Sequence, residues 1–183
     1  MKLLNPILIF AVAFLGVFGQ AALPGLRHLL GAQVDLLPVL MVYAALNTGL
    51  TTVALLAIFS GLWFDALSAT PLGVTILPLF LVGFVIFLQR DLILRGLPFA
   101  QMVLGTIASA TVPLLTVLVQ LTIGKPPLLG WSSLWQWLVM TAGGAVATPI
   151  IFALFDWLNR ALGYQPRKEN SFRPDREILR GRN

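Results

Sequence analysis

The chain contains no cysteine, a single histidine and few charged residues, and each shortage excludes a class of protein. Without cysteine, neither disulfide bonds nor thiolate metal sites can form. Only 10% of the 183 residues are charged and 58% are hydrophobic, whereas soluble domains are roughly 25% charged. The mean hydropathy is +0.90. These proportions exclude a soluble domain and predict a membrane protein.

The apolar runs are continuous rather than alternating, which predicts membrane-spanning helices and not an outer-membrane barrel. Four of the runs have lengths suited to one crossing each, and they cover residues 3–23, 72–88, 97–123 and 134–158. The first run is longer than a signal-peptide core and follows a single lysine. We therefore interpret it as an uncleaved anchor rather than a cleaved signal peptide.

A further apolar stretch, residues 36–64, fits neither one crossing nor a soluble core. Its 29 residues would form a helix of roughly 44 Å, against a hydrocarbon core of about 30 Å. The Asn-Thr-Gly segment at 47–49 interrupts it, and Asn followed by Gly suits a left-handed helix C-cap. We expect two short helices that meet there, the first capped by Asp35 and carrying Pro38 in its first turn.

The distribution of basic residues favours two short helices over one long helix. With six crossings, both termini and the loop at residues 90–95 share one side, which holds ten of the twelve Lys and Arg residues. A single long helix would move this short loop to the other side, where it would break the positive-inside rule. Arg27 and Lys125 remain outside. The cytoplasmic set is Lys2, Arg90, Arg95, Arg160, Arg167, Lys168, Arg173, Arg176, Arg180 and Arg182.

We therefore predict an all-α polytopic membrane protein with six transmembrane helices over residues 1–162. Residues 163–183 form a basic cytoplasmic tail with six basic and three acidic residues, a composition typical of disordered or membrane-surface segments. In such a protein the excess of basic residues indicates contact with anionic lipids rather than with nucleic acid.

The polar residues of the predicted spans do not form a catalytic set. The only histidine, His28, lies beside Arg27 in a loop, and Ser60, Ser68 and Ser109 have no neighbouring base in sequence. The sequence shows neither metal-ligand spacing nor a phosphate-binding glycine loop. We therefore expect no enzyme activity and no cofactor or metal. Few ionisable groups lie at the predicted membrane midplane, which argues against a proton-coupled transporter.

Small residues recur at a spacing of four in the last two spans, which predicts close approach of helix backbones. We expect packing within the chain to account for them, with dimerisation as the alternative. The pairs are Gly105 with Ser109, Gly143 with Ala147, and Gly144 with Thr148.

Two interpretations of Asp65 stay open. It follows Gly61 by about one turn and lies at the negative end of its predicted helix, where a carboxylate is disfavoured unless it is paired. It is either an anchor at a wet outer interface, paired with Arg27 or Lys125, or an interaction site. Under both interpretations we expect its removal to change stability only slightly.

One part of the chain resembles a known family, the rod shape-determining protein MreD. The resemblance spans about forty residues, and the other helices match mainly in size, number and charge pattern. Two departures are Val34, where the family often has proline, and the Trp63-Phe64 pair, where aliphatic residues are common. The matching residues are Asp35-Leu36-Leu37, Val42-Tyr43-Ala44, Gly61-Leu62 with Asp65, and Pro71-Leu72-Gly73.

The resemblance implies a non-enzymatic subunit of the bacterial cell-elongation machinery in the inner membrane. Such proteins bind the single-span protein MreC and help connect MreB filaments with the glycosyltransferase RodA and its class B penicillin-binding partner. The candidate partner-binding residues that it implies are Asp35, Tyr43, Gly61, Asp65, Pro71 and Gly73.

The same resemblance supplies an alternative. The family's fold is similar to the six-helix substrate-binding subunits of energy-coupling-factor vitamin transporters, which would hold a small molecule on the outer side. Those subunits dock through alanines spaced four apart. Here Ala11 and Ala13 are followed, four residues on, by Leu15 and Val17, which argues against the transporter alternative.

Overall fold

The computed structural model describes residues 4–22, 35–68, 71–91, 97–124 and 130–161, and this part of the chain is all-α. Its helices overlap the six apolar segments expected from the sequence, although α5 begins later than expected. The predicted tail at 163–183 and the outer cations Arg27 and Lys125 lie outside the described residues. The helices are α1 (Leu4–Ala22), α3 (Leu37–Asn47), α4 (Leu50–Leu67), α5 (Ile76–Gln89), α6 (Pro98–Thr122) and α7 (Trp131–Ala161).

Three of these helices, α4, α6 and α7, are long and apolar enough to cross a membrane. The other apolar helices are shorter, and α3 has only 11 residues. The all-α prediction is confirmed, and by helix length and hydropathy the chain is a candidate multi-pass membrane protein.

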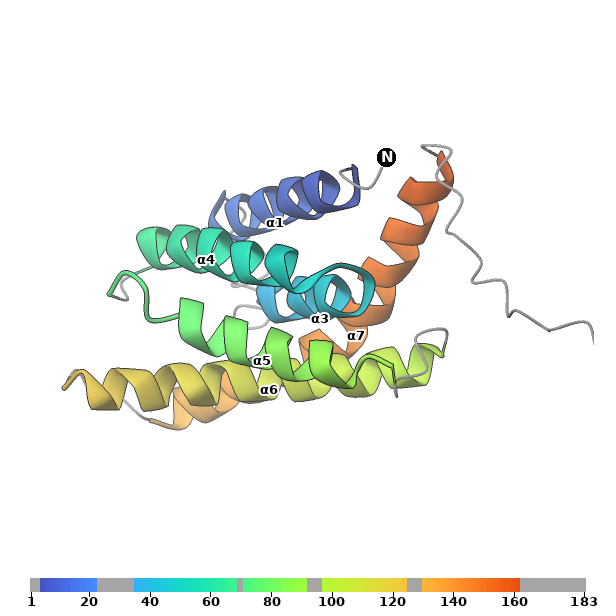
Figure 1. The fold of residues 1–183 in the computed structure, drawn as a ribbon. Helices are drawn as coiled ribbons and strands as arrows, with labels where there is room; N and C mark the ends of the chain where they lie inside the picture. Colours follow the sequence, from blue (N-terminus) through green and yellow to red (C-terminus); the bar gives the residue numbers. More distant parts are fainter. Residues whose placement is uncertain (1–3, 23–34, 69–70, 92–96, 125–129, 162–183) are drawn as a thin grey trace, which may run out of the picture.

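Helix α3 is the centre of the bundle, and it packs against each of the other five described helices. Ten of its eleven residues are buried, which explains why it shows no polar face. Figure 1 shows α1, α4, α5 and α6 in succession across the molecule, with α3 among them and α7 running behind α6 and then rising away from it.

The predicted break between α3 and α4 is confirmed, but its expected left-handed cap is wrong. Thr48 is extended (φ −126°, ψ −175°) and Gly49 has a φ of −87°. Instead, both the backbone N–H and the hydroxyl of Thr48 donate to the carbonyl oxygen of Ala44, at 2.8 and 2.6 Å. Arg90, whose guanidinium lies 4.3 Å from the Phe87 ring centre, donates to the Thr48 carbonyl at 3.3 Å. The turn is therefore tied to the far end of α5.

Helices α6 and α7 approach closely through their glycines, as the small-residue spacing predicts. A Cβ on Gly105 would lie 2.5 Å from the carbonyl oxygen of Gly144, and a Cβ on Gly144 would lie 2.9 Å from the carbonyl oxygen of Gly105. Trp137 of α7 donates its indole N–H to the carbonyl oxygen of Ala110 in α6 at 3.0 Å. Ala110 lies about one turn before Pro113, where α6 is prone to kink. Packing within the chain therefore accounts for two of the three pairs, Gly105 with Ser109 and Gly144 with Thr148.

At the end of α7, Asp156 and Arg160 have the four-residue spacing of a local ion pair, but a different contact forms. The Arg160 Nε donates to the backbone oxygen of Asp156 at 3.1 Å, rather than to its carboxylate. Within the described ranges, the salt bridge that forms is between Arg90 and Asp91 at 3.7 Å, and the Asp91 side chain is 85% exposed.

Candidate functional site

The residues singled out by the sequence lie in two places. Asp35 and Tyr43 belong to the core around α3, whereas the other four lie where α4 turns into α5. We call this second region, residues 61–76, the α4–α5 junction. Its expected residues are Gly61, Asp65, Pro71 and Gly73.

Asp65 is the hydrogen-bonding centre of the α4–α5 junction. Its Oδ2 accepts the backbone N–H groups of Gly73 at 2.8 Å and Thr75 at 3.1 Å. Its Oδ1 accepts the hydroxyl of Thr75. The side chain is 1% exposed, so these donors replace water around the carboxyl group.

The local sequence explains why the chain turns here. Pro71 begins a turn that the N–H of Val74 closes on the Pro71 carbonyl at 3.4 Å, and Gly73 adopts φ +92°, a conformation open to glycine. Thr75 occupies the N-cap position of α5 without a side-chain cap bond to its own helix. Its hydroxyl bonds to Asp65 instead, so the carboxyl of one helix fixes the start of the next.

Gly61 lets α5 begin against α4. A Cβ at this position would lie 3.0 Å from both the Cα and the Cγ1 of Ile76, the first residue of α5. Backbone cannot yield as a flexible side chain can, so a larger residue would push the two helices apart. The junction therefore joins Gly61, Asp65 and Gly73 in one set of contacts.

The expectation that Asp65 lies at a wet interface is wrong, and the small effect on stability expected there loses its basis. Asp65 is buried and bonded to three donors of its own chain. Sequence reasoning also missed Thr75, although a threonine directly before an apolar run is a recognisable N-cap signal.

Asp35 does cap α3, but from one residue further out than expected. Leu36 occupies the N-cap position, and the Asp35 Oδ1 accepts the N–H of Leu37 at 2.9 Å. Pro38 lies in the first turn, as predicted. Burial raises the pKa of Asp35 to about 6, while the bond from Leu37 acts in the opposite direction. A carboxyl group here is thus poorly solvated next to an apolar helix.

Tyr43 is a core residue between α3 and α7. Its ring stacks on Phe155, with centroids 4.1 Å apart, and meets the ring of Phe152 edge-on at 5.0 Å. It is 3% exposed. The structure therefore separates Tyr43 and Asp35 from the junction residues, and it assigns both to the packing around α3.

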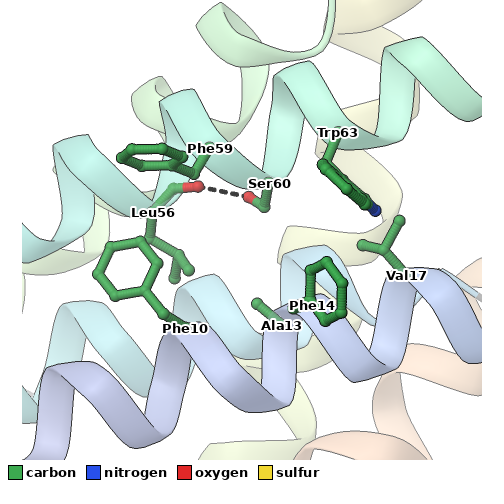
Figure 2. Close-up of a pocket in the computed structure, with 8 residues that line it drawn as sticks. All are labelled: Phe10, Ala13, Phe14, Val17, Leu56, Phe59, Ser60 and Trp63. Carbon is green, nitrogen blue, oxygen red and sulfur yellow. Dashed lines mark hydrogen bonds between the residues drawn. The ribbon is translucent and has the colours of Figure 1, made fainter.

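An apolar pocket of about 270 Å³ lies between α1 and α4, lined by four residues of each helix. Figure 2 shows its side chains facing one another across the gap, with Ala13 and Ser60 in the middle and bulkier residues at both ends. The Ser60 hydroxyl donates to the carbonyl of Leu56 in its own helix at 2.5 Å.

Comparisons with family models, with curated proteins and with solved structures returned no match for this chain. In the described part of the chain, no three His, Asp or Glu side chains gather as metal ligands. The candidate site with the most specific geometry is therefore the α4–α5 junction.

Proposed function

We propose that the chain is a non-enzymatic membrane subunit of the bacterial cell-elongation machinery, of the MreD kind. It binds MreC and links MreB filaments to RodA and a class B penicillin-binding protein in the inner membrane. The observation that carries the proposal is the α4–α5 junction. Three of the residues that support the resemblance to MreD, Gly61, Asp65 and Gly73, act together there.

The junction gives a physical reason for the spacing of these residues. The carboxyl of Asp65 must reach a backbone N–H eight positions on, and Gly61 must lie under the first residue of α5. Because Gly61 and Asp65 are buried, they act by positioning the turn rather than by touching a partner. The side chains available for contact are their exposed neighbours, above all Leu72, which is 69% exposed.

No observation favours the vitamin-transporter alternative. A small-molecule site combines an apolar cavity with several convergent polar groups that orient the ligand. Apart from the Trp63 indole N–H, the pocket between α1 and α4 is lined by one polar side chain, Ser60, whose hydroxyl hydrogen is already donated to Leu56.

Co-purification tests the proposal. The tagged protein, extracted from its native membrane in mild detergent, is expected to recover an MreC-like chain. Leu72→Ser should reduce that recovery without lowering thermal stability. Leu88→Ser is the matched control, because Leu88 is 64% exposed at the opposite end of α5.

Two results would overturn the proposal. One is recovery of a bound vitamin or an ATPase module in place of an MreC-like chain, which would support the transporter alternative. The other is recovery of no MreC-like chain at all. Equal recovery by the wild type and Leu72→Ser would keep MreC binding but would remove the junction from the partner surface.

A further inference from the structure

The pocket between α1 and α4 is a gap held open by an aromatic contact at each end. Phe10 meets Phe59 edge-on, with ring centroids 5.9 Å apart, and Phe14 lies 5.0 Å from Trp63. Both contacts pair one residue of α1 with one of α4. They fix the separation of the two helices, so the helices cannot close on the space between them.

Two small residues create the space. Ala13 and Ser60 face each other in the middle of the pocket, and they are 4% and 6% exposed. Neither side chain is long enough to fill the distance that the aromatic contacts set. Because Ser60 donates its hydroxyl hydrogen within its own helix, the wall facing the gap is nearly all hydrocarbon.

The chemistry and size of the pocket limit what can occupy it. Ordered water needs two to four polar partners, whereas an apolar cavity of about 150 Å³ stays dry and binds benzene. The volume of about 270 Å³ exceeds that of such a cavity, so there is room for an apolar occupant larger than benzene. A slender hydrocarbon chain fits both limits.

The pocket is continuous with the surface that a bilayer would cover. Helix α4 is one of the three candidate spans. Three residues that line the pocket are also substantially exposed, Phe14 at 49%, Phe59 at 62% and Trp63 at 43%. A chain on the outer surface of α1 and α4 can therefore enter without crossing a polar barrier.

We infer that an acyl chain of a membrane phospholipid occupies this pocket and wedges α1 against α4. The chain fills volume that protein side chains leave empty, and it touches Ala13 and Ser60 at its deepest point. Because α1 packs on α3 and α4, the bound lipid contributes to one of its two main contacts. The packing of α1 against α4 therefore depends on the bound lipid.

Photolabelling in a bilayer tests this inference. The full-length protein is reconstituted in vesicles of phosphatidylethanolamine and phosphatidylglycerol that contain a trace of phosphatidylcholine with a diazirine midway along one acyl chain. After irradiation, labelled peptides are sequenced by mass spectrometry. We expect labels on buried Ala13 and Ser60 in addition to labels on outward-facing Leu15, which any surrounding lipid reaches.

Filling the pocket should remove the inner labels alone. Ala13→Leu is expected to reduce labelling of Ser60 several-fold and to leave labelling of Leu15 unchanged. Ala11→Leu adds the same side chain to an exposed position of α1 that does not line the pocket, so it should label like the wild type. Ser60→Leu fills the gap from the other side if Ala13→Leu does not fold.

The inference is overturned if the wild type carries labels on Leu15 but none on Ala13 or Ser60. It is also overturned if inner labelling persists in a folded Ala13→Leu protein, because the labels would then not come from lipid in the pocket. Lipid occupancy is independent of MreC binding, since the vesicles contain no partner. Failure here therefore leaves the proposed function standing, and failure of co-purification leaves lipid binding standing.

Discussion

At the scale of single residues, Asp65 has the most specific environment in the described structure. Alanine in its place would leave the N–H groups of Gly73 and Thr75 and the Thr75 hydroxyl without their acceptor. A buried donor left unpaired costs about 1–3 kcal/mol. We expect Asp65→Ala to lower the free energy of unfolding by about 3 kcal/mol, measured by thermal unfolding in detergent.

The controls separate hydrogen bonding from charge. Asp65→Asn keeps a carbonyl oxygen that can accept from the backbone, so its loss should be well under half that of the alanine variant. Asp156→Ala removes an exposed carboxyl at the end of α7 and should change stability little. If Asp65→Ala unfolds at the wild-type temperature, the bonds at the α4–α5 junction do not stabilise the protein.

The raised pKa of Asp35 predicts that stability falls as the pH rises, the opposite of the usual effect of a paired carboxylate. Its pKa is about 6 in the folded chain against an ordinary 3.8. Between these values the folded state holds a proton that the unfolded state has released, so stability is full below about pH 4 and falls as the pH rises to 6. The loss is at most about 3 kcal/mol.

Asp35→Asn is the matched variant, because an amide keeps the shape and does not titrate. Its thermal midpoint should vary less between pH 4 and pH 6.5 than that of the wild type, while the amide oxygen can still accept the N–H of Leu37. Parallel curves for the two proteins would show that Asp35 is well solvated in the folded state.

At the scale of helices, the sequence predicts where elements lie better than how they end. The break at residues 47–49 is predictable from the Asn-Thr-Gly segment and from the distribution of basic residues. The bond that holds it comes from Arg90, 42 residues from Thr48, and no local pattern indicates such a partner. Likewise, α5 begins at Ile76 rather than near residue 72, because its start depends on Asp65 in another helix.

The pocket was not predictable from sequence for a related reason. Ala13 and Ser60 are unremarkable residues in apolar runs, and they matter only because the register of α1 on α4 sets them opposite each other. The small-residue pairs of α6 and α7 were predictable, because a spacing of four places both members on one face of the same helix.

Those pairs lead to a prediction about the α6–α7 contact. The Cβ added by Gly105→Ala would lie 2.5 Å from the carbonyl oxygen of Gly144, which is backbone and cannot rotate away. We expect the two helices to separate, with a loss of about 1–3 kcal/mol, the usual cost of overpacking. Thermal unfolding of the purified variant measures it.

Gly19→Ala is the control for the same chemical change in another helix. No atom lies within 4 Å of the Cβ that it adds to α1, and alanine is the better helix former by about 0.5–1 kcal/mol. It should therefore be neutral or slightly stabilising. A Gly105→Ala protein as stable as Gly19→Ala would mean that α6 and α7 adjust without cost.

At the scale of the whole molecule, the two tied turns organise the bundle. The α3–α4 turn is bonded to the end of α5 through Arg90, and the end of α4 is bonded to the start of α5 through Asp65. Helices α4 and α5 therefore run in opposite directions, with one turn at each end, as Figure 1 also shows. In a membrane, the two turns lie on opposite sides.

This arrangement predicts the orientation of the chain. Asn47 should face the cytoplasm and Ser68 the outside, because ten of twelve basic residues fall on the side of the α3–α4 turn in a six-span chain. The protein has no cysteine, so single cysteines report without background. In intact spheroplasts, an impermeant thiol reagent should label Ser68→Cys and should label Asn47→Cys only after the membrane is opened.

Gln89→Cys makes the test sharper. Gln89 is exposed at the end of α5, next to Arg90, which bonds to the α3–α4 turn. Gln89→Cys must therefore be labelled under the same conditions as Asn47→Cys, whichever way the protein is inserted. Suppose that Asn47→Cys and Gln89→Cys label in intact spheroplasts and that Ser68→Cys labels only after the membrane is opened. The bundle is then correct, and the charge rule has assigned the wrong side. If Asn47→Cys and Gln89→Cys label on opposite sides, α3 and α4 do not form two crossings, because a bonded pair of turns cannot be divided by a bilayer.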